Sequence, residues 1–422
     1  MRRLSALLVL VALGAGVYFL PPPAAPAPDP APPTQPLIFS VCPVSEGSGR
    51  STEVAVASTL GGSSAITLFA GGSTVGSLEI SLGEDGAVIM PVVDIAAVGT
   101  VGGLVELPGG QAAAGSRTRG PASTTLEACV REIPTRVVAT GGSTVSGGEL
   151  TLHLMNPFAG DAVATLVVHS DAGLEASDRF TRVIVPSRGS NVITLNNTIP
   201  GRDWVTVRVE VTRGRVVAAL RQTVGDRAMS WNAVEPGTSW LVPVPTEVEG
   251  RLVIAGADAG QVEYQVDVYG PDGVTEALVS GELAEGEMAS IPLADLEGAR
   301  AARVVATGPI VTTLQLTDGT KHSATTGAPA PAGSWLLPAA STGSARLVIL
   351  NPELEDASVV IRAMREDGRE FRSTVAAESV LETSLDGADA YLVDSDVPIV
   401  VLLYEAGEMD DALAMGTPIE DE

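Results

Sequence analysis

Histidine is scarce in this chain, and two of its three copies lie close enough in sequence to share one site. His153 and His169 flank Asn156, so we expect them on neighbouring strands, where two imidazoles can share a metal ion or a proton. Asp171 is the candidate third ligand, and no fourth ligand lies nearby in the sequence. Two strand histidines with unrelated partners are the favoured interpretation, a shared site is the alternative, and we predict no bound metal or cofactor.

Motifs for covalent catalysis or phosphate binding are absent from the sequence. There is no GxSxG elbow and no SxxK pair to activate a serine. The many Gly-Gly pairs lack the GK[ST] ending of a phosphate loop, and they are typical of hairpin turns. With 51 acidic residues some pair of carboxylates will always lie close together, so acid pairs do not discriminate. The sequence therefore predicts a protein that is not an enzyme.

Cys42 and Cys129 are the only cysteines, and they form no CxxC motif. In an extracytoplasmic protein a lone pair favours one disulfide. It would close a loop of 87 residues around the first repeat and contribute about 4 kcal/mol by restricting the unfolded chain. Two buried free thiols are the alternative.

Four tryptophans are the main candidates for stacking on a sugar. Trp240 and Trp335 open equivalent segments, Trp-Leu-Val-Pro and Trp-Leu-Leu-Pro, which indicates a packing role. Trp204 and Trp231 have no such counterparts. We therefore predict Trp204 and Trp231 as candidate ligand contacts.

Net charge is −26, distributed as −5 up to Val211 and −21 from Thr212 onward. So acidic a chain does not bind nucleic acid, which requires clustered Lys and Arg. Solubility explains the acidity, and a surface that attracts cations is the alternative. The segments 394–396 and 408–411 resemble fragments of Ca²⁺ sites, but neither has the loop of an EF-hand.

Alternating apolar and polar residues dominate from Leu37 onward, as in 205–211 and 262–268. Such alternation is typical of antiparallel strands with one buried face. The chain also repeats. Asn156-Pro157 and Asn351-Pro352 are each followed by Asp-Ala at the same spacing, and by glycine 17 residues after the Asn.

These repeats predict an all-β fold of four tandem Ig-like β-sandwich repeats, each with six or seven short strands. A propeller or β-helix is the alternative. The predicted boundaries are 37–128, 129–236, 237–333 and 334–422.

The N-terminus has the pattern of an export signal and a membrane anchor. Arg2 and Arg3 precede an apolar run over 4–20, which predicts a signal anchor or transmembrane helix at 1–20 with a cytoplasmic N-terminus. Cleavage as a signal peptide is the alternative. Residues 21–36 are rich in Pro and Ala, which favours an extended stalk.

The Arg-start anchor, Pro/Ala stalk, Trp or Cys repeat openings and Leu-x-Asn-Pro turns together resemble an actinobacterial family of exported, membrane-anchored proteins. That family is classed as a domain of unknown function, and the resemblance covers residues 37–422. It implies an envelope location and transfers no catalytic residues.

We therefore expect a membrane-anchored, extracytoplasmic protein of the cell envelope that acts as a structural or protein-interaction scaffold. A module that binds cell-wall polysaccharide is the second hypothesis, and a Ca²⁺-dependent adhesion-like protein is a remote third. The expected partners are the membrane, through the N-terminal helix, and an envelope protein or polysaccharide.

Overall fold

The computed structural model describes most of the chain after residue 37. The described residues are 38–45, 49–95, 100–107, 109–271, 273–296, 298–318, 321–338, 345–364, 368–385, 388–406 and 411–419. The predicted anchor at 1–20 and stalk at 21–36 lie outside them. Among the described residues, no helix combines the length and the apolar character needed to cross a membrane.

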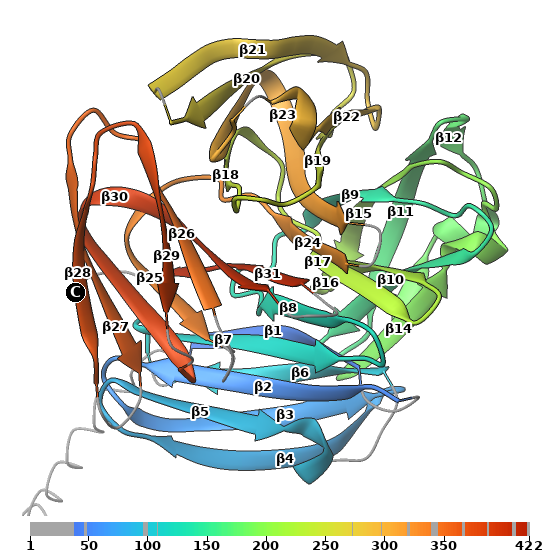
Figure 1. Ribbon diagram of the computed structural model, residues 1–422. Coiled ribbons are helices and arrows are strands. Elements are labelled where there is room, and N and C mark those ends of the chain that lie inside the picture. The colour runs from blue at the N-terminus through green and yellow to red at the C-terminus, as the bar shows by residue number, and fades with distance from the viewer. Residues whose placement is uncertain are drawn as a thin grey trace, which may run out of the picture. The chain divides into compact units, whose positions relative to one another are not determined.

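The described strands fall into four groups, which we call modules 1 to 4 in chain order (Figure 1). Module 1 contains β1 (Ile38–Ser45), β2 (Ser51–Ser58), β3 (Gly62–Ala70), β4 (Ser73–Leu82), β5 (Gly86–Pro91), η1 (Val92–Asp94), β6 (Thr100–Leu107), β7 (Ala112–Arg119) and β8 (Thr124–Ala128). Module 2 contains β9 (Arg136–Gly142), β10 (Gly148–Asn156), β11 (Ala162–Ser170), β12 (Gly173–Glu175), η2 (Asp178–Phe180), β13 (Val183–Val185), β14 (Gly189–Thr194), η3 (Leu195–Asn197), β15 (Val205–Arg213), β16 (Val217–Val224) and β17 (Arg227–Asn232).

Module 3 contains β18 (Gly237–Pro243), β19 (Gly250–Gly256), β20 (Val262–Gly270), β21 (Gly273–Leu283), β22 (Met288–Pro292), η4 (Leu293–Asp295), β23 (Ala301–Asp318) and β24 (Lys321–Thr326). Module 4 contains β25 (Ala332–Pro338), β26 (Ala345–Asn351), β27 (Ala357–Met364), β28 (Glu370–Val375), β29 (Ser379–Leu385), β30 (Ala390–Ala406), β31 (Asp411–Met415) and β32 (Thr417–Ile419). The described part of the chain is thus all-β, with six antiparallel sheets that are consistent with tandem β-sandwich repeats.

Each module has two layers, and module 2 shows the arrangement most simply. One sheet has the order β14-β10-β16-β17, and the other has the order β12-β11-β15-β9. Along β11 buried and half-buried residues alternate strictly, because successive side chains of a strand point to opposite faces. The buried set faces the opposite sheet, where Leu152 and Leu220 are fully buried in the same apolar core.

The strand order differs from that of an Ig sandwich, an order that the sequence alone does not predict. In an Ig sandwich the sixth and seventh strands are neighbours in one sheet. Here β15 pairs with β9 and β11, whereas the next strand, β16, pairs with β10 and β17 in the other sheet. The alternating pattern that predicted the strands does not encode which strands pair, so it could not reveal this order.

In modules 3 and 4 one continuous strand takes the place of these two. The first part of β23 pairs with β20 and its second part pairs with β19. Likewise β30 pairs first with β27 and then with β26. Pro309 and Pro398 lie at these crossings, where the strand changes partners and a missing N–H does least harm. In each of these modules the long strand therefore joins the two layers into one continuous sheet.

The repeated Asn-Pro turns have the same internal bonding. The side chain of Asn156 donates to Gly160 O at 2.9 Å and to Val185 O at 3.2 Å, and its Oδ1 accepts from Phe158 N. Asn351 makes the equivalent bonds in module 4. Because each amide satisfies several backbone groups in a buried turn, these asparagines have a structural role.

Candidate functional site

The histidines do not form a shared site. His153 lies on β10 and His169 lies on β11, in opposite sheets of module 2. His153 is buried beside Thr151, 3.0 Å from its hydroxyl, and burial together with the cations Arg221 and Arg50 lowers its pKa to about 4. His153 and His169 each follow a residue that faces the core between the two sheets, Leu152 and Val168, so the two imidazoles lie on the outer faces of opposite sheets. The shared metal or proton hypothesis for this pair is therefore wrong.

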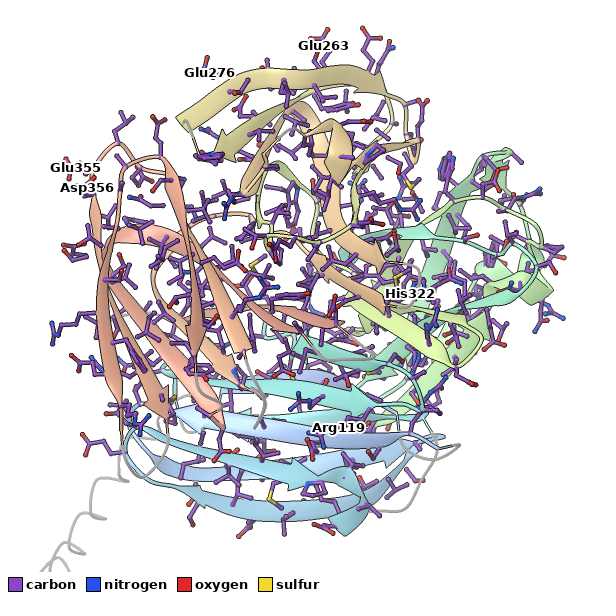
Figure 2. All side chains as sticks on the ribbon, in the orientation of Figure 1. Arg119, Glu263, Glu276, His322, Glu355 and Asp356 are labelled. Atoms are coloured by element: carbon purple, nitrogen blue, oxygen red, sulfur yellow. A yellow bond between two sulfur atoms is a disulfide. The ribbon has the colours of Figure 1, made fainter. Side chains whose placement is uncertain are left out.

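His169 packs against a different module instead. Its ring lies against the backbone of Gly286 in module 3, where even a methyl group would overlap the imidazole. Burial lowers the pKa of His169, and Glu285 opposes that shift. His322 lies on β24, as Figure 2 shows, and burial also lowers its pKa. These histidines are neutral contact residues near neutral pH.

The acidic segment 394–396 is engaged within module 4. Asp394 accepts from Ser334 Oγ at 2.9 Å and pairs with Arg362 at 3.0 Å, while Asp396 accepts from Ser358 N at 2.7 Å. Segment 408–411 lies largely outside the described residues. Over the described ranges no three His, Cys, Asp or Glu side chains are placed to hold one metal ion.

Three of the four tryptophans are buried in cores, and the fourth, Trp204, is partly exposed. Trp240 and Trp335 are buried, and their indole nitrogens donate to Ile310 O and Ile399 O, each at 2.8 Å. Their matching bonds confirm the packing role. Trp231 is also buried, with 1% of its surface exposed, so the structure does not present it to a ligand as predicted. Trp231 lies on the face of β17 that packs into the apolar core of module 2.

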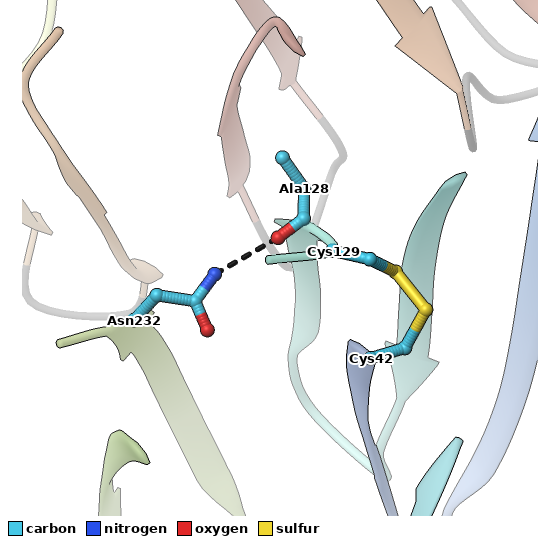
Figure 3. Close-up of a disulfide and its surroundings, with 4 residues drawn as sticks. All are labelled: Cys42, Ala128, Cys129 and Asn232. Carbon is cyan, nitrogen blue, oxygen red and sulfur yellow. Dashed lines mark hydrogen bonds between the residues drawn. A yellow bond between two sulfur atoms is a disulfide. The ribbon is translucent and has the colours of Figure 1, made fainter. Parts of the chain in front are cut away.

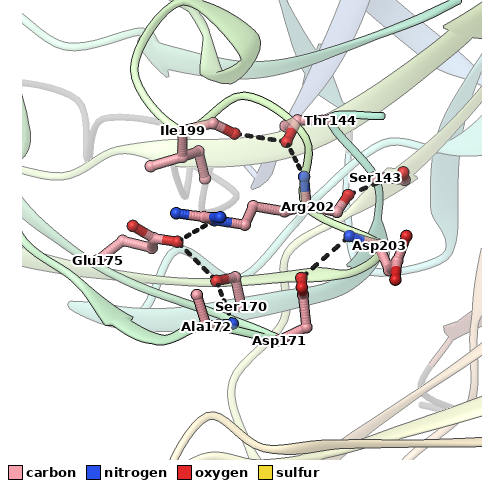
Figure 4. Close-up of polar contacts among 9 residues, drawn as sticks. All are labelled: Ser143, Thr144, Ser170, Asp171, Ala172, Glu175, Ile199, Arg202 and Asp203. Carbon is pink, nitrogen blue, oxygen red and sulfur yellow. Dashed lines mark hydrogen bonds and ion pairs between the residues drawn. The ribbon is translucent and has the colours of Figure 1, made fainter. Parts of the chain in front are cut away.

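Trp204 is half-buried, next to a polar network at one end of module 2 (Figure 4). In that network Glu175 pairs with Arg202 and accepts from Ser170 Oγ at 2.6 Å. Asp171 accepts from the backbone N–H of Asp203 at 3.0 Å. These bonds fix the loop that carries Trp204, but no aromatic partner or cavity accompanies it among the residues that the structure describes. A ligand role for Trp204 stays a prediction.

The predicted disulfide between Cys42 and Cys129 is present and buried (Figure 3). Cys129 follows β8 directly, and the Val41–Val130 bridge continues the pairing of that segment with β1. Cys129 therefore completes module 1, whereas the predicted boundary placed it at the start of the second repeat. A buried disulfide is typical of extracytoplasmic proteins.

The same position in modules 3 and 4 holds glycine. Gly327 and Gly416 each follow the last strand that pairs with the long strand of their module. A Cβ at Gly327 would lie 2.8 Å from Val242, and one at Gly416 would lie 2.9 Å from Trp335. In these modules a large neighbouring side chain fills the space, and in module 1 the disulfide fills it.

The four strands β8, β17, β24 and β31, which we call the terminal-strand cluster, pack against one another in a closed cycle. Side-chain hydrogen bonds join consecutive members. Asn232 Nδ2 donates to Ala128 O at 2.9 Å (Figure 3), and Thr326 Oγ1 donates to Asn232 O at 3.0 Å. Leu413 N donates to Ser323 Oγ at 2.9 Å. The cluster thus links each module to the next.

Buried charges accompany the cluster. Arg117 of module 1 and Glu405 of module 4 form an ion pair in which both side chains are less than 10% exposed. Glu127 on β8 bonds to Ser230 on β17 and lies near Arg221, and burial raises its pKa to about 7. Because removing one member of a buried pair leaves an uncompensated charge, these contacts make the closed arrangement specific.

A cleft of about 490 Å³ lies where module 4 meets module 1. Its walls include the polar side chains of Thr59 and Gln111 from module 1 and of Ser334, Arg362 and Asp394 from module 4. Clefts between domains are common ligand sites. No sequence pattern predicted this cleft, because its two walls are more than 200 residues apart in the chain.

Comparison with known proteins gives one family match. A family model described as a family of unknown function (DUF5719) matches residues 128–334, which span modules 2 and 3. No curated protein matches the chain.

Three solved structures give weak matches. An anti-sigma factor domain-containing protein is 7% identical over 68% of this chain and 84% of its own, with a TM-score of 0.14. Another, from Clostridium clariflavum, is 7% identical over 86% and 100%, with a TM-score of 0.13. A tetra-tandem repeat from the extending region of a large adhesion protein is 11% identical over 91% and 99%, with a TM-score of 0.11. TM-scores this low inform neither fold nor function.

Proposed function

We propose that this chain is a non-enzymatic, membrane-anchored scaffold of the cell envelope that holds partner proteins outside the cytoplasm. The observation that carries the proposal is the terminal-strand cluster. Its strands β8 and β31 join the first and last modules, and the Arg117–Glu405 pair joins the same two modules, so residues 37–422 form one compact unit rather than a flexible string. A fixed unit can hold several partners at set positions.

The outer edge strands are the surfaces on which partners would dock. In β21 most side chains are exposed, and Figure 2 shows Glu276 pointing outward there and Glu263 pointing outward nearby. A register shift between Val266 and Val268 and a positive φ at Ala277 interrupt the pairing of this edge. Such bulges block edge-to-edge extension of a sheet, so we expect side chains rather than strand addition to bind partners.

The disulfide and the N-terminal pattern support the proposed location. The Cys42–Cys129 bond favours an oxidising compartment. Arg2 and Arg3 before the apolar run 4–20 favour a retained anchor, and the stalk at 21–36 would hold the modules away from the bilayer. The match over residues 128–334 is to a family of unknown function.

Affinity capture with the tagged full chain tests the proposal. Solubilised envelope proteins and purified wall polysaccharide would be offered separately. We expect the same few proteins to be retained in replicate captures and lost when the reduced, unfolded chain is the bait. Retention of polysaccharide alone would overturn the scaffold proposal.

Glycan binding is the second candidate, and the cleft between modules 4 and 1 favours it. Hydroxyl, amide, carboxylate and guanidinium groups line that cleft, and such groups bind sugar hydroxyls. Arg362→Ala should weaken polysaccharide retention if this candidate is right, and Arg372→Ala, at an exposed site on β28, is the matched control.

A further inference from the structure

The loops that precede β10 and β19 are equivalent. In module 2 the loop after β9 turns back onto the segment after η3, and Thr144 N donates to Arg202 O at 2.9 Å. In module 3 the loop after β18 meets the segment after η4, and Val244 N donates to Arg300 O at 2.8 Å. The same backbone bond therefore closes both loops.

The two loops also share their unusual backbone conformation. Gly147 has φ of 94° and Glu247 has φ of 59°, both in the left-handed region. With these positions aligned, residues 144–150 match 244–250 without a gap, and η3 (Leu195–Asn197) matches η4 (Leu293–Asp295). The loop and the 3₁₀ turn therefore correspond between the two modules, and their side chains differ.

In module 2 one side chain fills the space between loop and turn. Asn196 Oδ1 accepts from Leu150 N at 2.7 Å. Its Nδ2 donates to Gly148 O at 2.9 Å and to Thr144 O at 3.2 Å. A primary carboxamide thus binds one backbone N–H and two backbone carbonyls of this loop.

In module 3 the matching residue is Ala294, and the carboxamide is missing. A cavity of about 720 Å³ lies there, within the size range of small-ligand sites. Ala294 lines it, and so do Val244, Val248 and Gly250, which match the three residues that bind Asn196 in module 2. The cavity is therefore lined by backbone groups whose counterparts in module 2 bind a carboxamide.

We propose that this cavity binds a primary carboxamide carried by an Asn or Gln side chain of a partner polypeptide. The ligand oxygen would accept from Gly250 N, and the ligand NH₂ would donate to the carbonyls of Val244 and Val248. Two N–H groups are needed for the two carbonyls. An acetamido group of a sugar has one N–H and satisfies only one of them.

The charges at the cavity also favour an amide over an acid. Glu247 and Glu249 line it together with Arg300. A carboxylate offers no N–H to the two carbonyls and would be repelled by the two glutamates. The cavity therefore selects Asn or Gln side chains over Asp or Glu.

Saturation-transfer NMR on the full chain tests the ligand class. The probes are propionamide, N-methylacetamide with one N–H, and propionate. We expect binding of propionamide, with N-methylacetamide and propionate roughly tenfold weaker or undetected. Equal binding of N-methylacetamide or propionate would overturn the proposal.

Two variants locate the site. Ala294→Asn rebuilds the module 2 contact and should abolish propionamide binding. Asp295→Asn adds the same group one residue along, where module 2 has Asn197, and should leave binding intact. Propionamide binding that survives Ala294→Asn would overturn the assignment.

The assignment of the carboxamide to a partner protein rests on the proposed scaffold function. The capture experiment distinguishes failure of this assignment from failure of the scaffold function. Loss of a captured protein with Ala294→Asn, but not with Asp295→Asn, supports a partner side chain in the cavity. A captured protein that Ala294→Asn still retains contradicts it and leaves the scaffold standing. Propionamide binding without any captured protein contradicts the scaffold and leaves the amide site standing.

Discussion

Glu127 should make the stability of the chain fall as pH rises, and Glu127→Gln should remove that fall. The carboxyl lies on β8 in the terminal-strand cluster, is 9% exposed and bonds to Ser230. Gln has nearly the same shape as a protonated Glu and keeps a carbonyl oxygen that can accept a hydrogen bond from Ser230. The substitution therefore fixes the neutral form at every pH.

Burial raises the pKa of Glu127 from 4.5 to about 7, with Ser230 and Arg221 opposing the shift. A carboxyl with a raised pKa stabilises the fold fully below pH 4.5, and this contribution is lost as pH rises through 7. A difference of about 2.5 units, at about 1.4 kcal/mol per unit, corresponds to about 3 kcal/mol. The entropy of unfolding is about 2.1 cal/mol/K per residue. If residues 37–422 unfold together, the Tm of Glu127→Gln at pH 8 should therefore exceed that of the wild type by about 4 °C.

Thermal unfolding of wild type and Glu127→Gln at pH 4.5 and pH 8 is the assay. We expect equal Tm at pH 4.5 and a higher Tm for the variant at pH 8. His153 titrates in both proteins, so its contribution cancels in the difference. Glu106→Gln, an exposed site on β6, is the control for loss of a carboxylate. A lower Tm of Glu127→Gln at pH 8 would show that the carboxylate is ionised and paired with Arg221, and would refute this reasoning.

Three further perturbations test other contacts. Glu405→Gln should destabilise the chain by about 3–5 kcal/mol, because it removes the buried ion pair with Arg117, and the change should appear in chemical denaturation. Asn351→Ala should lose about 2–3 kcal/mol in the same assay, since several buried backbone groups of the turn lose a hydrogen bond. Replacing Cys42 and Cys129 together by serine should lower stability by about 4 kcal/mol, while thiol labelling of the denatured, unreduced wild type should detect no free cysteine.

The sequence could predict strands, repeats and the disulfide because these follow from local pattern or from a lone residue pair. Alternation in 205–211 directly encodes the two faces of β15. It does not encode partners, so the path of β16 into the opposite sheet was missed. Trp231 shows the same limit, since only the packed core reveals which side of β17 faces inward.

The candidate sites were harder to predict, because they join residues that are distant in the sequence. The cleft between modules 4 and 1 and the pair Arg117–Glu405 exist only once the cycle of modules closes. The cavity at Ala294 had a usable signal. Aligning repeats 2 and 3 places Ala opposite Asn196, and the loss of a bonded side chain in an otherwise equal turn predicts a vacancy.

The closed cycle of modules also sets an order of assembly. Arg117 and Glu405 are 288 residues apart, so module 4 leaves a ribosome long after module 1. Contacts at such separation form late, because the intervening chain must be ordered before they stabilise anything. During synthesis β8 and Arg117 therefore stay uncovered until module 4 arrives. A truncated or stalled chain would expose this buried charge and strand edge, which marks it for a chaperone or a protease.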